Sequence, residues 1–247
     1  FSGGVCSWAA AKRVVERHGS KDIRLAFADT FIEDDDLYRF LVMGAANIVG
    51  IDAPMEVLNL LWDLPPIDQP TARGFALKKA ARLAMLLVPN LAWIYDGRTP
   101  WEVMRDEKII GNSKFDPCSK ILKRQLLDRW RNANCLPDET VNYVGLDWTE
   151  EHRLERLQKR TAPWRYEAPM TDPPYLSKPD MLTWLKREGI QPPRLYMMGF
   201  SHNNCGGFCI KAGQAQFALL LRTMPERYAY HEAQEEEMRT MVGDHSI

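Results

Sequence analysis

The sequence of 247 residues contains no apolar run of the roughly 20 residues that span a bilayer, and no signal peptide is visible. Its formal net charge of -1 argues against a protein whose whole surface binds nucleic acid. Its five cysteines are an odd number, which disfavours a disulfide framework and favours a reducing compartment. We therefore expect a cytoplasmic protein without a membrane partner.

Several catalytic patterns are also missing. No Gly-Lys-Ser/Thr follows the first glycines at the spacing of a Walker A motif, and no serine-centred or histidine-centred hydrolase triad is legible. The strand that would lead into Ser2 is reduced to Phe1. We expect native residues to precede Phe1, and Ile247 is a candidate internal stop.

The first motif that is present is a glycine loop. Two glycines stand between hydroxyl residues, and a helix-forming run follows. Such a loop lets backbone N–H groups close on an anion, and the helix N-terminus adds its positive dipole end. The other reading is a glycine turn before an ordinary amphipathic helix. The residues expected to hold a phosphate are Ser2, Gly3, Gly4, Val5, Cys6 and Ser7.

A short apolar run, Ile23 to Ala28, predicts a buried strand that ends at Asp29 and Thr30. Loop, helix and strand together form an α/β unit. Ligands in such folds collect outside the carboxyl ends of parallel strands. Asp29 and Thr30 are therefore added to the expected nucleotide site.

Ser-Gly-Gly-x-x-Ser, a helix and a strand ending in Asp-Thr resemble the PP-loop ATP pyrophosphatases, and more closely their phosphoadenylyl-sulfate (PAPS) reductase-like branch. The resemblance implies a three-layer, Rossmann-like (HUP-type) α/β fold with a mostly parallel sheet, and it implies ATP with Mg²⁺. Cys6 stands where the family has Asp. Phosphate binding by the loop is still expected, because backbone groups provide it. The role that the family's acidic side chain has is not expected of Cys6.

A second motif, His202-Asn-Asn-Cys205-Gly-Gly-Phe-Cys209, can aim two sulfurs at one point, because its glycines permit a tight backbone. Two buried cysteines in a glycine turn are the other reading. Cys118-Ser-Lys-Ile-Leu-Lys123 resembles the Cys-Thr/Ser-x-x-Leu-Lys segment of the same family. The resemblance implies Cys118, Cys205 and Cys209 as ligands of a [4Fe-4S] cluster, which leaves one iron open unless Cys135 or His202 closes it. Zn²⁺ is the competing assignment.

A third segment, Gly145 to Arg153, resembles the family's Gly-x-Arg-x-x-Glu-Ser turn, with Asp147 in place of the arginine. A plain capped helix is the alternative. Lys123 is one of several basic residues that can neutralise phosphate or sulfate. The residues expected to act in catalysis are Ser2, Ser7, Lys123, Glu150 and Arg153.

The chain divides into an expected nucleotide-binding α/β domain over 1–200 and a helical, cysteine-bearing C-terminal region over 201–247. Residues 51–90 match no part of the family core and read as an insertion that ends in a helix over 71–87. The basic residues of that helix, Arg73 to Arg82, read as a solvated face or as a partner surface. Asp34 to Asp36 read as helix capping and solvated charge, with metal ligation as the alternative. Residues 91–95 read as a strand, 141–145 as a buried strand and 195–200 as a short strand, and Thr149 is the expected cap of the helix that follows 141–145.

These expectations favour an enzyme that adenylates an acceptor with ATP, releases pyrophosphate and transfers sulfur to a nucleobase or other small acceptor, with a possible sulfur donor protein. A sulfonucleotide reductase is the second hypothesis, although the glutamate-cysteine-glycine-leucine-histidine tail of true PAPS reductases is missing. A nucleotide-binding regulatory or defence module without turnover is the third, supported by Cys6 in place of the acid.

Overall fold

A computed structural model describes residues 1–243 of the chain as a mixed α/β protein that is 58% helical. Strand β1 (Leu25–Asp29) pairs in parallel with β2 (Leu91–Tyr95), and Phe27 lies opposite Trp93 in the register. Both strands are short apolar runs, which favours burial on both faces. The predicted strand at Leu91–Tyr95 is confirmed, and the strand predicted at 23–28 lies over Leu25–Asp29.

A second parallel pair is formed by β3 (Val141–Tyr143) and β4 (Arg165–Glu167). The strand predicted from Val141 is present, but it is half-buried and not a core strand. In residues 1–243 the strands form two separate two-stranded sheets. The α/β class is thus confirmed, whereas these two strand pairs do not confirm the three-layer, Rossmann-like sheet expected from the family resemblance.

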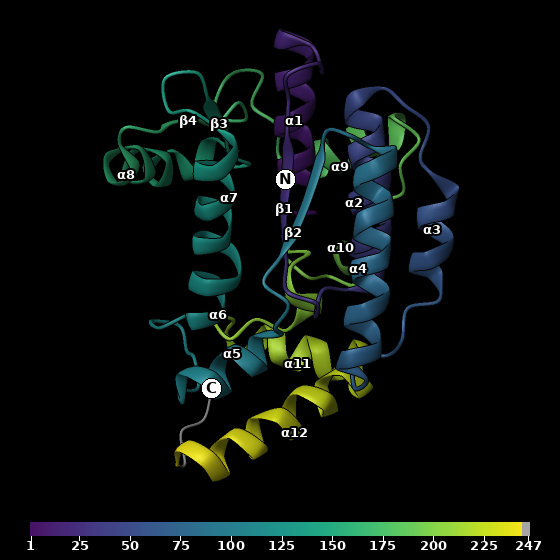
Figure 1. Cartoon of the computed structure of the whole chain (residues 1–247), viewed down its shortest axis with the longest axis vertical. Coiled ribbons are helices and arrows are strands. Elements are labelled where there is room, and N and C mark those ends of the chain that lie inside the picture. Colours follow the sequence, from purple (N-terminus) through teal and green to yellow (C-terminus); the bar gives the residue numbers. More distant parts are fainter. Residues whose placement is uncertain (244–247) are drawn as a thin grey trace.

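Helices pack on the β1–β2 pair from both sides (Figure 1). The first core cluster is built from β1, β2 and the helices α1 (Val5–His18), α2 (Asp35–Val49), α3 (Met55–Trp62), α4 (Pro70–Leu87) and α9 (Lys178–Arg187). The helix predicted over 71–87 is confirmed by α4. The buried alanines and Leu77 of α4 pack in this core cluster. The part of residues 51–90 that forms α4 is therefore part of the hydrophobic core.

The remaining helices and helical turns lie between and after these elements. They are α5 (Pro100–Glu107), α6 (Pro117–Ser119), the π-helical segment η1 (Lys120–Gln125), α7 (Leu126–Asn134), the 3₁₀ turn η2 (Trp148–Glu150), α8 (Glu151–Thr161), α10 (Arg194–Met197), the 3₁₀ turn η3 (Cys205–Gly207), α11 (Gln214–Thr223) and α12 (Pro225–Val242). The strand predicted at 195–200 is wrong: the chain begins helix α10 there, after Pro193.

A second core cluster joins the C-terminal region to the middle of the chain. Trp101 and Met104 of α5 pack with Phe208 after η3 and with Met238 of α12. Trp101 Nε1 donates a hydrogen bond to His231 Nδ1 at 3.0 Å, inside this cluster. The cysteine-bearing segment therefore rests on residues from both sides of the boundary expected near residue 200. None of the helices described within residues 1–243 is long and apolar enough to cross a membrane.

Candidate functional site

The glycine loop leads directly into α1, with Gly4 as the N-cap residue. Ser7 Oγ donates to Gly4 O at 2.8 Å and accepts from Ser2 N at 3.1 Å, so the two serines close the loop on itself. Gly3 has φ +74, a conformation that L side chains rarely adopt, and a Cβ there would lie 2.9 Å from Leu37. Glycine at position 3 is thus required by the backbone of this loop, whereas Gly4 has an extended conformation with φ -105.

The backbone N–H groups at the start of α1 are only partly paired. Val5 N donates to Tyr196 Oη at 3.3 Å, whereas those of Cys6 and Ser7 make no hydrogen bond within residues 1–243. These are the donors that every helix N-terminus leaves unpaired, and they lie at its positive dipole end. Asn203 adds a second polar contact: its Nδ2 donates to Gly3 O at 2.8 Å.

Asn203 is 1% exposed, and its Oδ1 has no hydrogen-bond partner in the described part of the chain. A buried acceptor without a donor is costly, and ligands often satisfy such groups. Sequence reasoning missed Asn203, although it adjoins the predicted His202. A hydroxyl or amino group of a ligand beside the loop is the type of partner that this oxygen needs.

The predicted turn from Gly145 lies against the loop. A Cβ on Gly145 would come within 2.7 Å of Ser7 N and Cα, so only glycine allows this approach. Burial, with Asp147 and Glu150, raises the pKa of Cys6 to about 12, so Cys6 carries no charge near neutral pH. Arg153 forms an ion pair with Glu150. The structure thus brings Gly145, Cys6 and Glu150 to one side of the loop.

A positive charge from α9 faces the same place. Lys178 is among the charges that act on Cys6, and its Nζ donates to Ser201 O at 2.6 Å. Partial burial, followed by the charges of Lys178 and Arg153, lowers the pKa of His202. The helix that Thr149 was expected to cap begins differently, because Asp147 Oδ1 accepts from Thr149 N at 2.9 Å.

Asp29 lies at the carboxyl end of β1, as predicted, but its carboxylate is 1% exposed and fully engaged. Tyr38 Oη and Phe31 N donate to Oδ1, and Trp93 Nε1 donates to Oδ2 at 2.9 Å. Burial raises the pKa of Asp29 to about 6 despite these three hydrogen bonds. Asp29 therefore has a structural role: its buried carboxylate fixes the carboxyl end of β1 through these hydrogen bonds.

Glu33 is a functional candidate that the sequence did not single out. Its side chain is 1% exposed, and it accepts from Thr30 Oγ1 at 3.1 Å, from Lys123 Nζ at 3.2 Å and from Cys205 N. A buried carboxylate requires such partners. The sequence offered one indication of a role for Glu33, its position four residues after Asp29 at the end of a predicted strand. This indication was missed because the acidic run 33–36 has the pattern of an exposed helix start.

Two of the three predicted thiols meet behind Glu33. Cys205 and Cys209 are joined by a thiol–thiol hydrogen bond, which lowers the pKa of Cys209 to about 6 and raises that of Cys205. Burial raises the pKa of Cys118 to about 11, and Cys118 is close enough to Cys209 for their charges to interact. Lys123 Nζ lies 3.8 Å from Cys205 Sγ. The structure thus gathers the predicted cysteines around a lysine ammonium group.

Thiolate sulfur is the donor that iron–sulfur clusters and zinc prefer, so the chemistry of this set suits either group. The geometry fits less well: within residues 1–243 no three His, Cys, Asp or Glu side chains are arranged to hold a metal ion. The cation beside Cys205 is Lys123. We therefore derive no chemical step through a metal at this site.

The capping predicted for the acidic run is confirmed at Asp34, but Asp34 is buried and paired, whereas the Asp35 side chain is 48% exposed. Asp34 is 0% exposed, caps α2 by accepting from Asp36 N, and binds Arg194 through both oxygens at 2.8 Å and 2.7 Å. Arg73 of α4 is also buried, and it donates to the carbonyls of Phe31, Glu33 and Pro65. These contacts fix the segment that connects β1 to α2.

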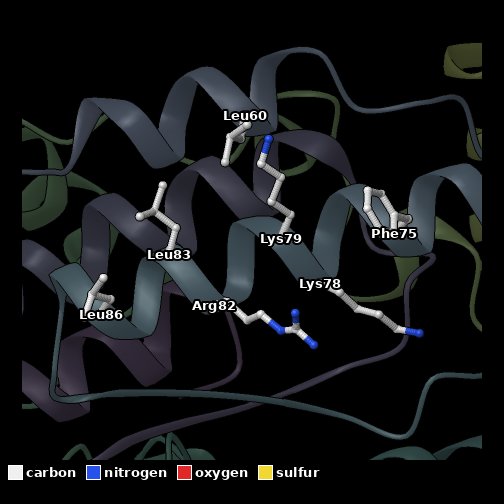
Figure 2. Close-up of a pocket in the computed structure, with 7 residues that line it drawn as sticks. All are labelled: Leu60, Phe75, Lys78, Lys79, Arg82, Leu83 and Leu86. Carbon is white, nitrogen blue, oxygen red and sulfur yellow. The ribbon is translucent and has the colours of Figure 1, made fainter.

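A cavity of about 460 Å³ lies apart from these residues, along α4 and against α3. Figure 2 shows Lys79 extending from α4 toward Leu60 of α3, with Phe75 further along the same helix. The lining residues are Leu60, Phe75, Lys78, Lys79, Arg82, Leu83 and Leu86. None of the predicted site residues lines this cavity.

Comparison of the chain with protein-family models, with curated proteins and with solved structures found no match in any of the three. The function is therefore argued from the geometry of the loop and of the residues around it.

Proposed function

We propose that the protein is an ATP-dependent adenylating enzyme that releases pyrophosphate and belongs with the PAPS reductase-like branch of the PP-loop proteins. The observation that carries this proposal is the glycine loop, where the N–H groups of Cys6 and Ser7 make no bond within residues 1–243, beside the buried, unpaired Asn203 Oδ1. A phosphate suits the first feature and a ligand hydroxyl or amino group suits the second. A nucleotide carries both.

In the proposed reaction, an oxygen of the acceptor attacks the α-phosphorus of ATP and the bond to the β-phosphate bridge breaks. The products are an adenylated acceptor and pyrophosphate, which leaves with the electron pair of the broken bond. The backbone N–H groups at Cys6 and Ser7 stabilise the charge that develops on the phosphates. Mg²⁺ bound with the nucleotide supplies further charge neutralisation.

The expected role of Ser2 and Ser7 is to keep the loop closed, since the two hydroxyls bond to each other at 3.2 Å. Glu150 and Arg153 line the side of the loop as an ion pair, a position suited to orienting the acceptor. Lys123 is held against Glu33 and Cys205. Its ammonium group therefore contacts the cysteine side of the site, and among the residues proposed to neutralise phosphate it has the weakest structural support.

Sulfur transfer to a nucleobase or other small acceptor is our preferred second step. It is supported by the three cysteines gathered near Lys123. A sulfur nucleophile would displace AMP from the adenylated acceptor, forming the carbon–sulfur bond as the carbon–oxygen bond breaks. Cys118, Cys205 and Cys209 are the residues that would hold a [4Fe-4S] cluster, or Zn²⁺ in its place, and no step of the transfer is assigned to that group. The proposed donor of that sulfur is a partner protein.

Two alternatives are favoured by single observations. The PAPS reductase-like segment at Cys118 favours a sulfonucleotide reductase. The neutral Cys6 in place of the loop acid favours a nucleotide-binding regulatory module without turnover. For the fold, we propose that the β1–β2 and β3–β4 pairs are parts of one three-layer, Rossmann-like arrangement.

The first test is ATP binding and pyrophosphate release by Gly145→Ala, with Gly213→Ala as its matched control. A Cβ at Gly145 would displace the Ser7 backbone, whereas a Cβ at Gly213 meets nothing within 4 Å. We expect Gly145→Ala to lower ATP affinity at least tenfold, about 1.4 kcal/mol, and the control to leave it unchanged. Unchanged ATP affinity in Gly145→Ala contradicts the loop assignment.

A second test separates the enzyme from the binding module and identifies the metal. Wild-type protein that binds ATP but releases no pyrophosphate with any candidate acceptor supports the regulatory alternative. Anaerobic purification followed by metal analysis and visible absorption distinguishes iron–sulfur from zinc. Cys205→Ala is expected to lose the metal, and full retention of metal in that variant contradicts the ligand set.

A further inference from the structure

Glu33 joins the two halves of the proposed site. Its carboxylate accepts hydrogen bonds from residues 30, 123 and 205, which belong to the loop after β1, the π-helical segment η1 and the cysteine loop. The side chain is 1% exposed, so no water replaces a lost partner. Each of these three segments is therefore held by the same pair of oxygens.

On the nucleotide side, Glu33 is tied to the end of β1. Thr30 Oγ1 donates to Glu33 Oε1 at 3.1 Å, and Thr30 follows Asp29 directly. Arg73 Nη2 donates to the Glu33 carbonyl at 3.2 Å. A displacement of the β1 end would therefore move the Glu33 carboxylate with it.

On the thiol side, Glu33 holds a strained backbone. Cys205 has φ +55, Gly206 φ +57 and Gly207 φ +85, so three consecutive residues are left-handed and the first of them is not glycine. Such a conformation is unfavourable at a non-glycine residue and persists only where its surroundings fix it. The hydrogen bond from Cys205 N to Glu33 Oε2 supplies that constraint.

The cysteine loop and the segment around Glu33 are in close backbone contact in addition to their hydrogen bond. A Cβ at Gly206 would lie 2.8 Å from Ile32 O and 1.9 Å from Arg227 Nη1, so the cysteine loop lies directly on the backbone next to Glu33. Lys123 completes the junction, because its Nζ is 3.2 Å from Glu33 Oε1 and 3.8 Å from Cys205 Sγ. Movement of Glu33 therefore changes both the backbone and the charge at Cys205.

We propose that Glu33 is a positioning residue that couples nucleotide binding at the glycine loop to the conformation of the Cys205–Cys209 loop. Asn203, two residues before Cys205, joins the glycine loop to this segment by donating to Gly3 O at 2.8 Å. This inference rests on the proposed function, since it takes ATP as the ligand. Coupling of this kind is reciprocal: a change in the cysteine loop alters ATP affinity by the same factor by which ATP alters the loop.

The test is hydrogen–deuterium exchange of the segment 201–211, with and without ATP, because the Cys205 N–H itself reports the bond to Glu33. Glu33→Gln keeps the shape and removes one acceptor oxygen and the charge opposite Lys123. Glu188→Gln is the matched control, since Glu188 also has three partners, Lys12, Asn47 and Trp184, away from the loop. Calorimetry measures ATP binding by each protein.

We expect ATP to slow exchange in this segment about tenfold in the wild type and in Glu188→Gln, within the 5- to 150-fold range of typical couplings. In Glu33→Gln, exchange without ATP rises about tenfold, ATP still binds with at most a tenfold loss, and the ATP effect falls below twofold. Urea unfolding of each variant separates a local opening of the segment from global destabilisation.

Two results overturn the proposal. In one, wild-type protein binds ATP but exchange in 201–211 does not change. In the other, Glu33→Gln keeps the full ATP effect. Failure of the proposed function is distinct, because calorimetry then shows no ATP binding by the wild type. That result refutes the coupling to nucleotide together with the proposed function. The positioning of Cys205 by Glu33 is tested separately, without ATP: unchanged exchange in Glu33→Gln refutes it.

Discussion

Arg73 and Arg82 both belong to α4, yet they lie in two regions of opposite character. Arg73 is 2% exposed and donates to three backbone carbonyls and to Asp35 at the β1–α2 connection. Arg82 lines the α3–α4 cavity and forms no ion pair or hydrogen bond within residues 1–243. The sequence of the helix does not distinguish the two arginines.

The comparison teaches where this chain uses charge to hold a conformation. At the β1–α2 connection, Glu33, Asp34 and Arg73 each have several hydrogen-bond partners. Along the α3–α4 cavity, Lys79 and Arg82 lie among leucines without partners in the described chain. Polar groups held in place favour binding because they need little reorganisation, which is why we assign the positioning role to Glu33, in the first region.

The largest expected effect is on stability, and it tests whether buried arginine differs from exposed arginine on one helix. Arg73→Met leaves Asp35 and three carbonyls without their donor, and we expect a loss of about 3–5 kcal/mol in the free energy of unfolding. Arg82→Met is expected to stay within about 0.5 kcal/mol. Urea unfolding measures both, and equal losses in the two variants would remove the distinction.

The second effect is on pH dependence. Asp29 has a folded pKa of about 6 against 3.8 in the unfolded chain, because of burial. Between about pH 4 and 6 the folded protein holds a proton that the unfolded chain releases, so stability falls as pH rises, by about 3 kcal/mol in all. Asp29→Asn should remove this slope, measured as the difference between the two pH profiles. The α3–α4 cavity lining has no carboxylate or histidine, so Lys78→Met should keep the slope, and its loss there would contradict the assignment.

The smallest effect is expected at the cavity itself. Phe75 is 75% exposed and Phe27 of β1 is 2% exposed. Phe75→Ser should change the free energy of unfolding by less than about 0.5 kcal/mol, whereas Phe27→Ala should cost about 3–5 kcal/mol. Thermal and urea unfolding of the pair measure this, and a large loss in Phe75→Ser would mean that the α3–α4 face is part of the core.

The parts of the fold that depend on neighbouring residues were predictable. The glycine loop, α1 and both central strands follow from local composition, because backbone freedom and short apolar runs are properties of a few adjacent residues. The short apolar run 195–200 was misassigned for the same reason: strand and buried helix segments of that length have the same pattern.

The contacts that complete the site were not predictable from such patterns. Glu33 meets Lys123 and Cys205 across 90 and 172 residues of chain, and Asn203 meets Gly3 across 200. A buried acid within an acidic run has the composition of an exposed one. Only the tertiary arrangement distinguishes Glu33 and Asp34 from solvated helix-capping residues.

The packing of α5 against α12 has a consequence for how the chain is completed during synthesis. Trp101 bonds to His231 across 130 residues, in a cluster that also contains Phe208 and Met238. Contacts so far apart in sequence form late, after the loop between them is closed. Trp101 therefore gains its full set of contacts only after α12 has been synthesised and has docked. Phe208 packs in the same cluster, so the final shape of the cysteine loop also depends on that late contact.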